Sequence, residues 1–379
     1  MTSKERMLCA LAGEKADRLP ATVHEWQDYH LQTYLGGMSI VEAFAKFGLD
    51  AEVPYSGGLK QSEAERGVGE LAGMCSAAGV SSAQWRVSGE VLRADADGRA
   101  VALRIETPEG ALTCKTGGDR KTTWVTEHLV KRDEDIELLA KYMPVPSVDL
   151  EQVSECYDEV GDGGILRGGV WGDQPGCWQH AACLMDINDL ILACFDKPDW
   201  VHRFLGILLE KKLRFVESMA GGKFDVIETG GGASSSTLIS PQLHEEFCLP
   251  YDRQLHDALH GLGFKVSYHT CGGTVGIEEH IVANGCDASE TLAPTSIGGN
   301  QEPWEYAAKI GGRLALIGGL DQYSVLTDGP AERIRSKVFE LFEKVGQDGG
   351  YILSLADHFF DAPVEHLQAY ADAARECTY

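Results

Sequence analysis

The chain has 379 residues, of which 44% are hydrophobic and 24% charged, as is ordinary for a globular protein. Its net charge of −25 argues against nucleic acid and anionic membranes as partners, because both repel an acidic surface. We find no apolar run near the roughly 20 residues of a transmembrane helix, and no signal peptide. The 11 cysteines have no paired spacing, so we expect reduced thiols and a cytoplasmic protein.

The first predicted element is an amphipathic helix over residues 3–13. A short strand follows at residues 21–24, and a second apolar edge at residues 50–54. Between about 85 and 128, short alternating runs are separated by turn residues such as Asp97-Gly98, a pattern typical of β-hairpins. We therefore predict a small antiparallel insertion over about residues 85–128.

Predicted strands and helices alternate from about residue 129 onward. The strands are 164–170, 224–228, 264–269, 288–292, 314–318 and 351–354. The helices are 187–196, 199–219, 241–261, 275–284, 303–310 and 330–346. With the two early strands the total is eight, and eight strands each followed by a helix indicate an α/β fold of the closed (β/α)₈ barrel type. We therefore predict a single barrel domain over residues 1–379.

Polar residues gather where these strands end, which is where such barrels place their active sites. The fifth strand ends in His269-Thr270-Cys271, whose first and third side chains share one side of an extended segment. Imidazole and thiolate together favour Zn²⁺ over Mg²⁺ or Ca²⁺. The alternative is a buried histidine beside an inert cysteine, and His24 at the first strand end could equally be a core histidine. The other polar strand ends include Glu228, Glu290, Asp357 and His358.

Three pairs of segments resemble one known family. They are Glu5-Arg6-Met7 with Ala16-Asp17-Arg18-Leu19-Pro20, Ile239-Ser240-Pro241 with Leu249-Pro250-Tyr251, and Gly349-Gly350-Tyr351-Ile352-Leu353 with Ala362-Pro363-Val364-Glu365. These segments resemble the uroporphyrinogen decarboxylase superfamily over nearly the whole chain. The resemblance implies a (β/α)₈ barrel. The superfamily holds decarboxylases and also zinc-dependent methyltransferases that work with corrinoid proteins.

Two segments separate these branches. The decarboxylases have Arg-Gln-Ala-Gly-Arg after the first strand, whereas residues 24–29 here contain no arginine. The methyltransferase branch has a His-x-Cys pair that His269 and Cys271 match, and Glu290 follows at an interval similar to that in cobalamin-independent methionine synthase. Thiol-activating methyltransferases take a further cysteine from the eighth strand end, but residues 354–360 here contain none.

The resemblance implies a zinc-dependent methyltransferase of a corrinoid system. It would move a methyl group from a small methylated substrate, such as a methoxylated aromatic compound, to Co(I) on a separate corrinoid protein. A site with one thiolate suits an ether or amine leaving group, because zinc there would be a stronger Lewis acid. The implied metal ligands are His269, Cys271 and Glu290. The implied acid or orienting residues are Glu228, Asp357 and His358. The implied substrate contacts are His24, Trp26, Gln174 and Trp178.

Three alternatives remain open at this stage. They are a methylcobalamin-dependent methyltransferase to a thiol or folate, a decarboxylase of the uroporphyrinogen type, and a barrel that binds a ligand without catalysis. No Asp-x-His-x-x-Gly pattern for binding cobalamin occurs in the chain, so we expect the corrinoid on a partner protein. We expect neither nucleic acid nor a membrane as partner, and we keep a homodimer as one expected assembly.

Overall fold

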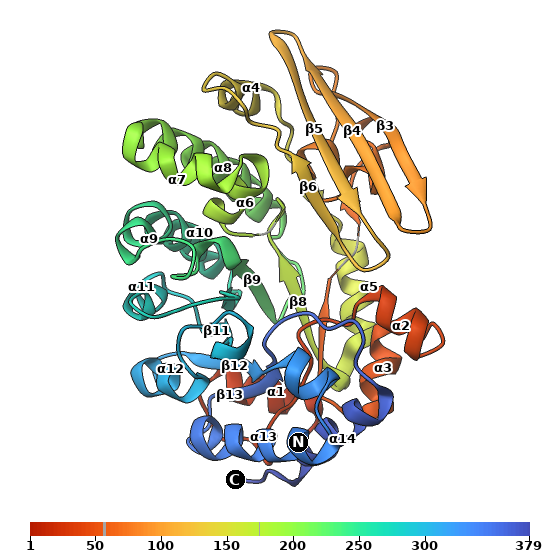
Figure 1. Cartoon of the computed structure of the whole chain (residues 1–379), viewed down its shortest axis with the longest axis vertical. Helices are drawn as coiled ribbons and strands as arrows, with labels where there is room; N and C mark the ends of the chain where they lie inside the picture. Colours follow the sequence, from red (N-terminus) through yellow and green to blue (C-terminus); the bar gives the residue numbers. More distant parts are fainter. Residues whose placement is uncertain (56–57, 174) are drawn as a thin grey trace. The chain divides into compact units, whose positions relative to one another are not determined.

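The computed structural model describes residues 1–55, 58–173 and 175–379 (Figure 1). The chain divides into two compact units. The first unit contains Met1–Gly57, Glu151–Gly169 and Gly222–Tyr379. The second contains Gly58–Leu150 and Val170–Gly221. The single barrel domain predicted over residues 1–379 stays a prediction.

The first unit is built on a curled parallel sheet of seven strands. In spatial order these are β1 (Ala51–Pro54), β8 (Gly164–Gly169), β9 (Val226–Gly230), β10 (Val266–His269), β11 (Ala288–Thr291), β12 (Ala315–Leu320) and β13 (Tyr351–Leu355). Nearly every strand residue is buried, as expected where a parallel sheet is covered on both faces. The predicted α/β fold is confirmed in this form.

The predicted first strand, residues 21–24, forms only an isolated bridge between Ala21 and Leu353 of β13. Two backbone hydrogen bonds make this bridge, from Leu353 to Pro20 and from Thr22 to Leu353, both 2.9 Å long. Asp50 donates its backbone N–H to Ala21 on the other side, at 2.8 Å. Pro20 has no N–H to donate to β13, so the pairing does not extend past this bridge and is too short to count as a strand.

Helices precede the first strand of this unit and lie between and after the later strands along the chain. They are α1 (Ser3–Leu11), α2 (Asp28–Tyr34), α3 (Ile40–Phe47), α5 (Leu150–Val160), α9 (Pro241–Phe247), α10 (Leu249–Gly261), α11 (Glu278–Ala283), α12 (Pro303–Ile310), α13 (Ala331–Leu341) and α14 (Val364–Glu376). Short π-helices occupy Gln322–Thr327 and Phe342–Gly346. The helix predicted over residues 241–261 is two helices that meet at Cys248, because Pro250 cannot donate a helical hydrogen bond.

Helix α1 packs against the beginnings of the strands. Thr2 caps it in a capping box with Glu5, which fixes where the helix starts. Its apolar face meets the first inward-facing layer of the sheet in one buried cluster. The cluster contains Met7, Ala10, Leu11, Ile165, Val226, Ala288, Ala315, Ile317 and Ile352. This end of the sheet is therefore filled by apolar side chains.

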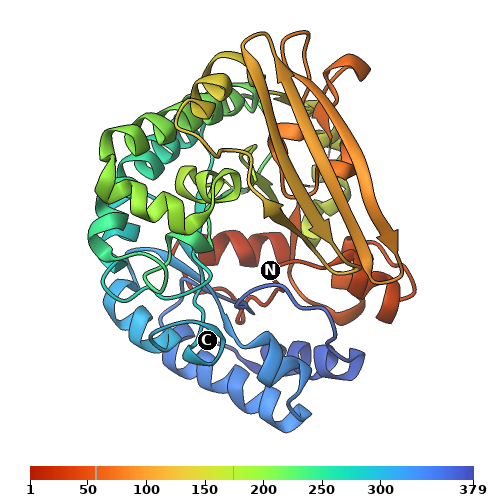
Figure 2. The same ribbon diagram turned by 45° about the horizontal axis from the view of Figure 1, so that its top comes forward.

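The second unit contains a four-stranded antiparallel sheet, which confirms the insertion predicted at about residues 85–128 (Figure 2). Its strands, in order, are β3 (Arg86–Asp95), β4 (Gly98–Thr107), β5 (Gly110–Gly118) and β6 (Thr123–Glu127). The same unit holds α4 (Asp135–Tyr142), α6 (Cys177–Leu184), α7 (Ile187–Asp196), α8 (Pro198–Ser218) and the strand pair β2 (Leu59–Lys60) and β7 (Ser147–Val148). None of the helices within the described residues has the length and apolarity that a membrane span requires.

Candidate metal centre

The carboxyl ends of the strands of the first unit carry a compact group of buried and partly buried polar side chains. Glu228 lies in β9, His269 ends β10 and Glu290 lies in β11. His24 follows the bridge at Ala21. The donor atoms of His24, Glu228, His269 and Glu290 all lie within 4.8 Å of one another. The structure therefore brings together four residues that the sequence places at four separate strand ends.

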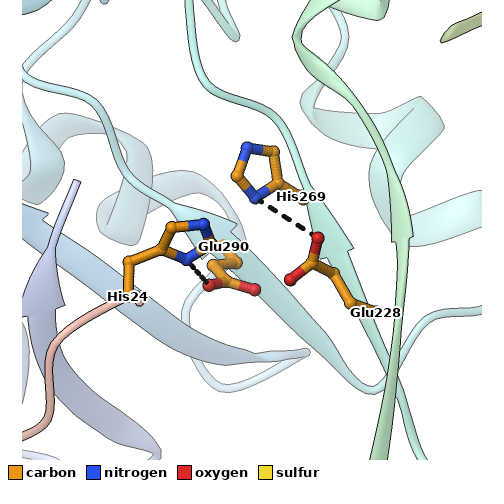
Figure 3. A group of neighbouring side chains, drawn as sticks. All are labelled: His24, Glu228, His269 and Glu290. Atoms are coloured by element: carbon orange, nitrogen blue, oxygen red, sulfur yellow. Dashed lines mark hydrogen bonds and ion pairs between the residues drawn. The ribbon is translucent and has the colours of Figure 1, made fainter. Parts of the chain in front are cut away.

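Each imidazole of this group faces a carboxylate (Figure 3). His24 Nδ1 donates a hydrogen bond to Glu290 Oε1 at 2.6 Å. His269 Nδ1 lies 3.9 Å from Glu228 Oε1, within ion-pair range but beyond hydrogen-bond range. The centroids of the two imidazole rings are 4.9 Å apart. The group is thus two histidine–carboxylate pairs set side by side.

A buried arginine lies between the two carboxylates. Arg167 Nη1 is 2.8 Å from Glu228 Oε2 and 3.3 Å from Glu290 Oε1. The same nitrogen is 3.7 Å from Glu52 Oε1, a side chain of β1 that is fully buried. One guanidinium therefore contacts three carboxyl groups, and its contacts fix the orientation of both glutamates that face the histidines.

Sequence reasoning missed Arg167 and Glu52, because both segments read as apolar strands. The alternation of side chains along a strand could have identified Arg167 as an inward-facing charge. Ile165 and Arg167 point to the same side of β8, and a charge on a strand that is buried on both faces needs a charged partner inside. Glu52 is likewise a charged residue type at a buried position of a strand, within the apolar edge predicted at residues 50–54.

Burial and neighbouring charges set the protonation of the group. Burial, with the charges of Arg167 and His269, lowers the pKa of His24 well below its ordinary value, so this imidazole is neutral at neutral pH. Burial also lowers the pKa of His269, but Cys271 and Glu228 outweigh burial and raise it well above the ordinary value. Burial raises the pKa of Glu52 to about 8 against the opposing charge of Arg167.

Cys271 joins His269 in a second, overlapping group of donors. The donor atoms of His269, Cys271 and Asp357 lie within 4.8 Å of one another. Burial raises the pKa of Asp357, but the charge of protonated His269 is the largest of the effects that outweigh it and lower the pKa below its ordinary value. Gly232 leaves room beside the thiol, since a Cβ there would lie 2.7 Å from Cys271 Sγ.

These residues fit a zinc ion. His269 Nδ1 and Glu290 Oε2 are buried atoms without a hydrogen-bond partner in the described part of the chain. Unpartnered buried polar atoms are costly unless a ligand satisfies them. Imidazole, thiolate and carboxylate are the donors that Zn²⁺ takes in proteins. The donors at this pole are thus of the kinds that the sequence predicted there, and the identity of the ion stays a prediction.

Comparison with known proteins decides the family. The model of the family described as "Uroporphyrinogen decarboxylase (URO-D)" matches residues 91–377. The chain belongs to the uroporphyrinogen decarboxylase family. The resemblance stated from the sequence is therefore confirmed.

Proteins similar in sequence to this chain carry two kinds of name, decarboxylase and methyltransferase. The uroporphyrinogen decarboxylase of Hydrogenovibrio crunogenus is 28% identical over 190 residues, and the match covers 48% of this chain and 50% of that protein. This chain thus matches only about half the length of that relative. The methylcobamide:CoM methyltransferase MtbA of Methanosarcina mazei is 22% identical over 391 residues, covering 100% of this chain and 99% of that protein. A solved methyltransferase from Methanosarcina mazei covers 99% of both chains with a TM-score of 0.65 and 17% identity, which supports the fold.

Of the other predicted substrate contacts, two are buried side chains and one is not described. Trp26 is 2% exposed and packs against Phe44, Phe47 and Phe359. Trp178 is buried in α6 of the second unit, and Gln174 lies outside the described residues. The roles assigned to these residues from the sequence, like those of the other site residues, stay predictions.

Proposed function

We propose that this chain is a zinc-dependent methyltransferase of a corrinoid system. It would move a methyl group from a small methylated substrate to Co(I) of a separate corrinoid protein. The observation that carries the proposal is the convergence of His269, Cys271 and Asp357 at the strand ends. The full-length similarity to MtbA of Methanosarcina mazei, whose name describes a methylcobamide:CoM methyltransferase, supports it.

Three residues of one group would hold the zinc ion, and Glu290 of the overlapping group is the candidate for a fourth ligand. His269 and Cys271 would supply a nitrogen and a sulfur, and Asp357 would supply an oxygen. Asp357 belongs to the eighth strand end, from which the thiol-activating methyltransferases that this chain resembles take a second cysteine. Glu290 supplies its unpartnered Oε2 while its other oxygen accepts the hydrogen bond from His24. A bound zinc ion would supply Lewis acidity to the oxygen or nitrogen that loses its methyl group.

Neighbouring side chains of this chain would orient the substrate and move a proton. His358 is 38% exposed, so it can reach a bound molecule, and it would donate a proton to the leaving atom. Glu228 is tied to Arg167 through Oε2, which leaves Oε1 to orient His269. The corrinoid carried by the partner would supply the nucleophile, so this chain needs none of its own.

The remaining predictions belong to the same proposal. The fold would be a closed (β/α)₈ barrel in which residues 20–22 take the place of the first strand, and their hydrogen bonds to β13 and Asp50 support this. A methoxylated aromatic compound is one donor to test. The cytoplasm is the proposed location, and a homodimer is one proposed assembly.

The similarity to MtbA favours a second candidate, methyl transfer from a methylcobamide to a thiol. The two candidates differ at Asp357. A carboxylate there leaves the metal with one thiolate donor, which is harder and less electron-rich than a site with two. This donor set favours the first candidate, because a less electron-rich ion activates an ether or amine better than a thiol.

Metal content tests the proposal. Full-length protein would be purified, and zinc would be measured by elemental analysis after reconstitution and removal of excess metal. His269→Ala and Cys271→Ala should each hold one zinc fewer per chain than the wild type. Cys286→Ala is the matched control, because this thiol is buried outside the site and donates to Ile281 O. Wild-type protein that binds no zinc would overturn the proposal.

Turnover then separates the candidates. Zinc-loaded protein would be mixed with a Co(I) corrinoid protein and with methoxylated aromatic compounds, methylamines or methyl thioethers. Formation of the methylcobalt absorption spectrum, lost in Cys271→Ala, supports the first candidate. Thiol-dependent demethylation of free methylcobalamin, with no reaction in the other assay, supports the second.

A further inference from the structure

A second group of metal-type donors lies beside the first. His24, Glu25 and His358 each offer one donor atom, and the three atoms lie within 4.8 Å of one another. None of these residues belongs to the group formed by His269, Cys271 and Asp357. The carboxyl ends of the strands therefore offer two complete three-residue donor sets next to each other.

His24 is prepared as a ligand by the residues beneath it. Its Nδ1 donates to Glu290, and an imidazole that gives one N–H to a carboxylate presents a lone pair on its other nitrogen. Metal-binding histidines are commonly oriented by such a carboxylate. Glu290 is 1% exposed and is itself held by Arg167, so this orientation is fixed from below.

Hydrogen bonds do not account for the convergence of the three donors. Glu25 Oε2 lies 3.5 Å from His358 Nδ1, at the limit of hydrogen-bond range. The rings of His24 and His358 are 5.0 Å apart between centroids and tilted by 53°. Among the described residues, no hydrogen bond joins any two of the three. The Gln27 amide nitrogen lies 2.9 Å from His358 Nδ1, so an ion bound at that nitrogen would displace the amide.

We infer that His24, Glu25 and His358 bind a second divalent transition-metal ion beside the zinc site. Two imidazoles and one carboxylate are a donor set that suits Zn²⁺ or Fe²⁺ and leaves positions open for other ligands. Glu25 and His358 are 35% and 38% exposed, so those positions face solvent. The inference goes beyond the proposed function, because none of its three ligands is needed to hold the first ion. With this ion bound, His358 would act as its ligand and no longer as a proton donor, and the cation itself would place positive charge near the leaving atom.

The two sites can be told apart by their donors. Full-length protein would be freed of metal with a chelator and titrated with Co²⁺ while its absorption spectrum is recorded. A site with Cys271 gives a thiolate-to-cobalt charge-transfer band in the near ultraviolet, whereas the second site has no sulfur and gives only weaker visible bands. We expect two Co²⁺ ions per chain, of which one produces the charge-transfer band. Zinc stoichiometry by elemental analysis should likewise be two.

Variants then assign the second ion. His358→Ala and Glu25→Gln should each bind one ion and keep the full charge-transfer band, and circular dichroism would show whether each is folded. His260→Ala is the matched control, because this partly exposed histidine belongs to none of the donor groups. Its Nε2 lies 2.8 Å from Asp287 Oδ2. This variant should keep two ions.

Three results would overturn the inference. Wild-type protein that binds a single ion and shows the charge-transfer band would overturn it while leaving the proposed function standing. Glu25→Gln and His358→Ala variants that both keep two ions would do the same. Wild-type protein that binds no ion at all would overturn both this inference and the proposed function.

Discussion

Two layers of side chains inside the seven-stranded sheet differ in character although they lie two residues apart on the same strands. Val226, Ile165 and Ala288 belong to the layer that packs on α1 and are buried in an apolar cluster. Glu228, Arg167 and Glu290 follow them on the same side of β9, β8 and β11. The layer closed by α1 can be purely apolar. The next layer faces the strand ends, where the charges compensate one another around Arg167.

Removal of Arg167 should have the largest effect on stability. Arg167→Met would leave Glu228, Glu290 and Glu52 close together without the guanidinium that contacts all three, and an uncompensated buried charge of this kind costs about 3–5 kcal/mol of unfolding free energy. Denaturant unfolding would measure the loss. Arg313→Met is the control, because Arg313 pairs with Glu279 at the surface and should cost at most about 1 kcal/mol. Equal losses in both variants would mean that the charged layer is not held by Arg167.

A cavity in the apolar layer should cost somewhat less and leave the site intact. Met7 is fully buried against the strand beginnings, so Met7→Ala should lower the unfolding free energy by about 3 kcal/mol through lost packing. Its zinc content should equal that of the wild type, because no donor atom touches this layer. Loss of zinc in folded Met7→Ala protein would show that the two layers are coupled.

The smallest effect concerns pH. Zinc binding requires His269 without its proton, and the raised pKa of His269 means that the metal-free protein holds this proton well above the ordinary range for histidine. Zinc affinity should therefore rise with pH, about tenfold or 1.4 kcal/mol per pH unit, and level off only above the raised pKa. Competition titrations with a chelator would measure the slope. An NMR titration of the His269 ring in metal-free protein would contradict the explanation if its pKa lay near 6.5.

Sequence patterns predicted the repeating parts of the fold well. The helix predicted at 187–196 is α7, and the strand predicted at 288–292 is β11 with one residue fewer. These segments succeed because their apolar periodicity reflects burial in the folded unit. The segment at 21–24 looked like a strand for the same reason, yet its pairing with β13 amounts to one bridge, which depends on the partner and not on local composition.

The site was predicted in part for a similar reason. Residues at strand ends, such as His269 and Glu290, follow from the fold, because parallel strands bring their carboxyl ends together. Arg167 lies within a strand, and its partner Glu52 is more than one hundred residues away, so only the folded sheet shows that the two side chains meet. The hydrogen bonds that Glu290 accepts from His24 and Arg167 likewise join segments that are far apart in the sequence, so they too are seen only in the folded sheet.

The adjacency of β1 and β8 has a consequence for folding kinetics. Neighbouring strands such as β10 and β11 are linked by a short helical connection, whereas the chain from Pro54 to Gly164 contains much of the second unit. Closing this loop of roughly 110 residues costs about 1.6 kcal/mol more conformational entropy than closing one of roughly 18. The β1–β8 seam should therefore form late, after the segment from β9 to β13 has assembled. Glu52 would then reach Arg167 only in the final step, when the polar network is completed.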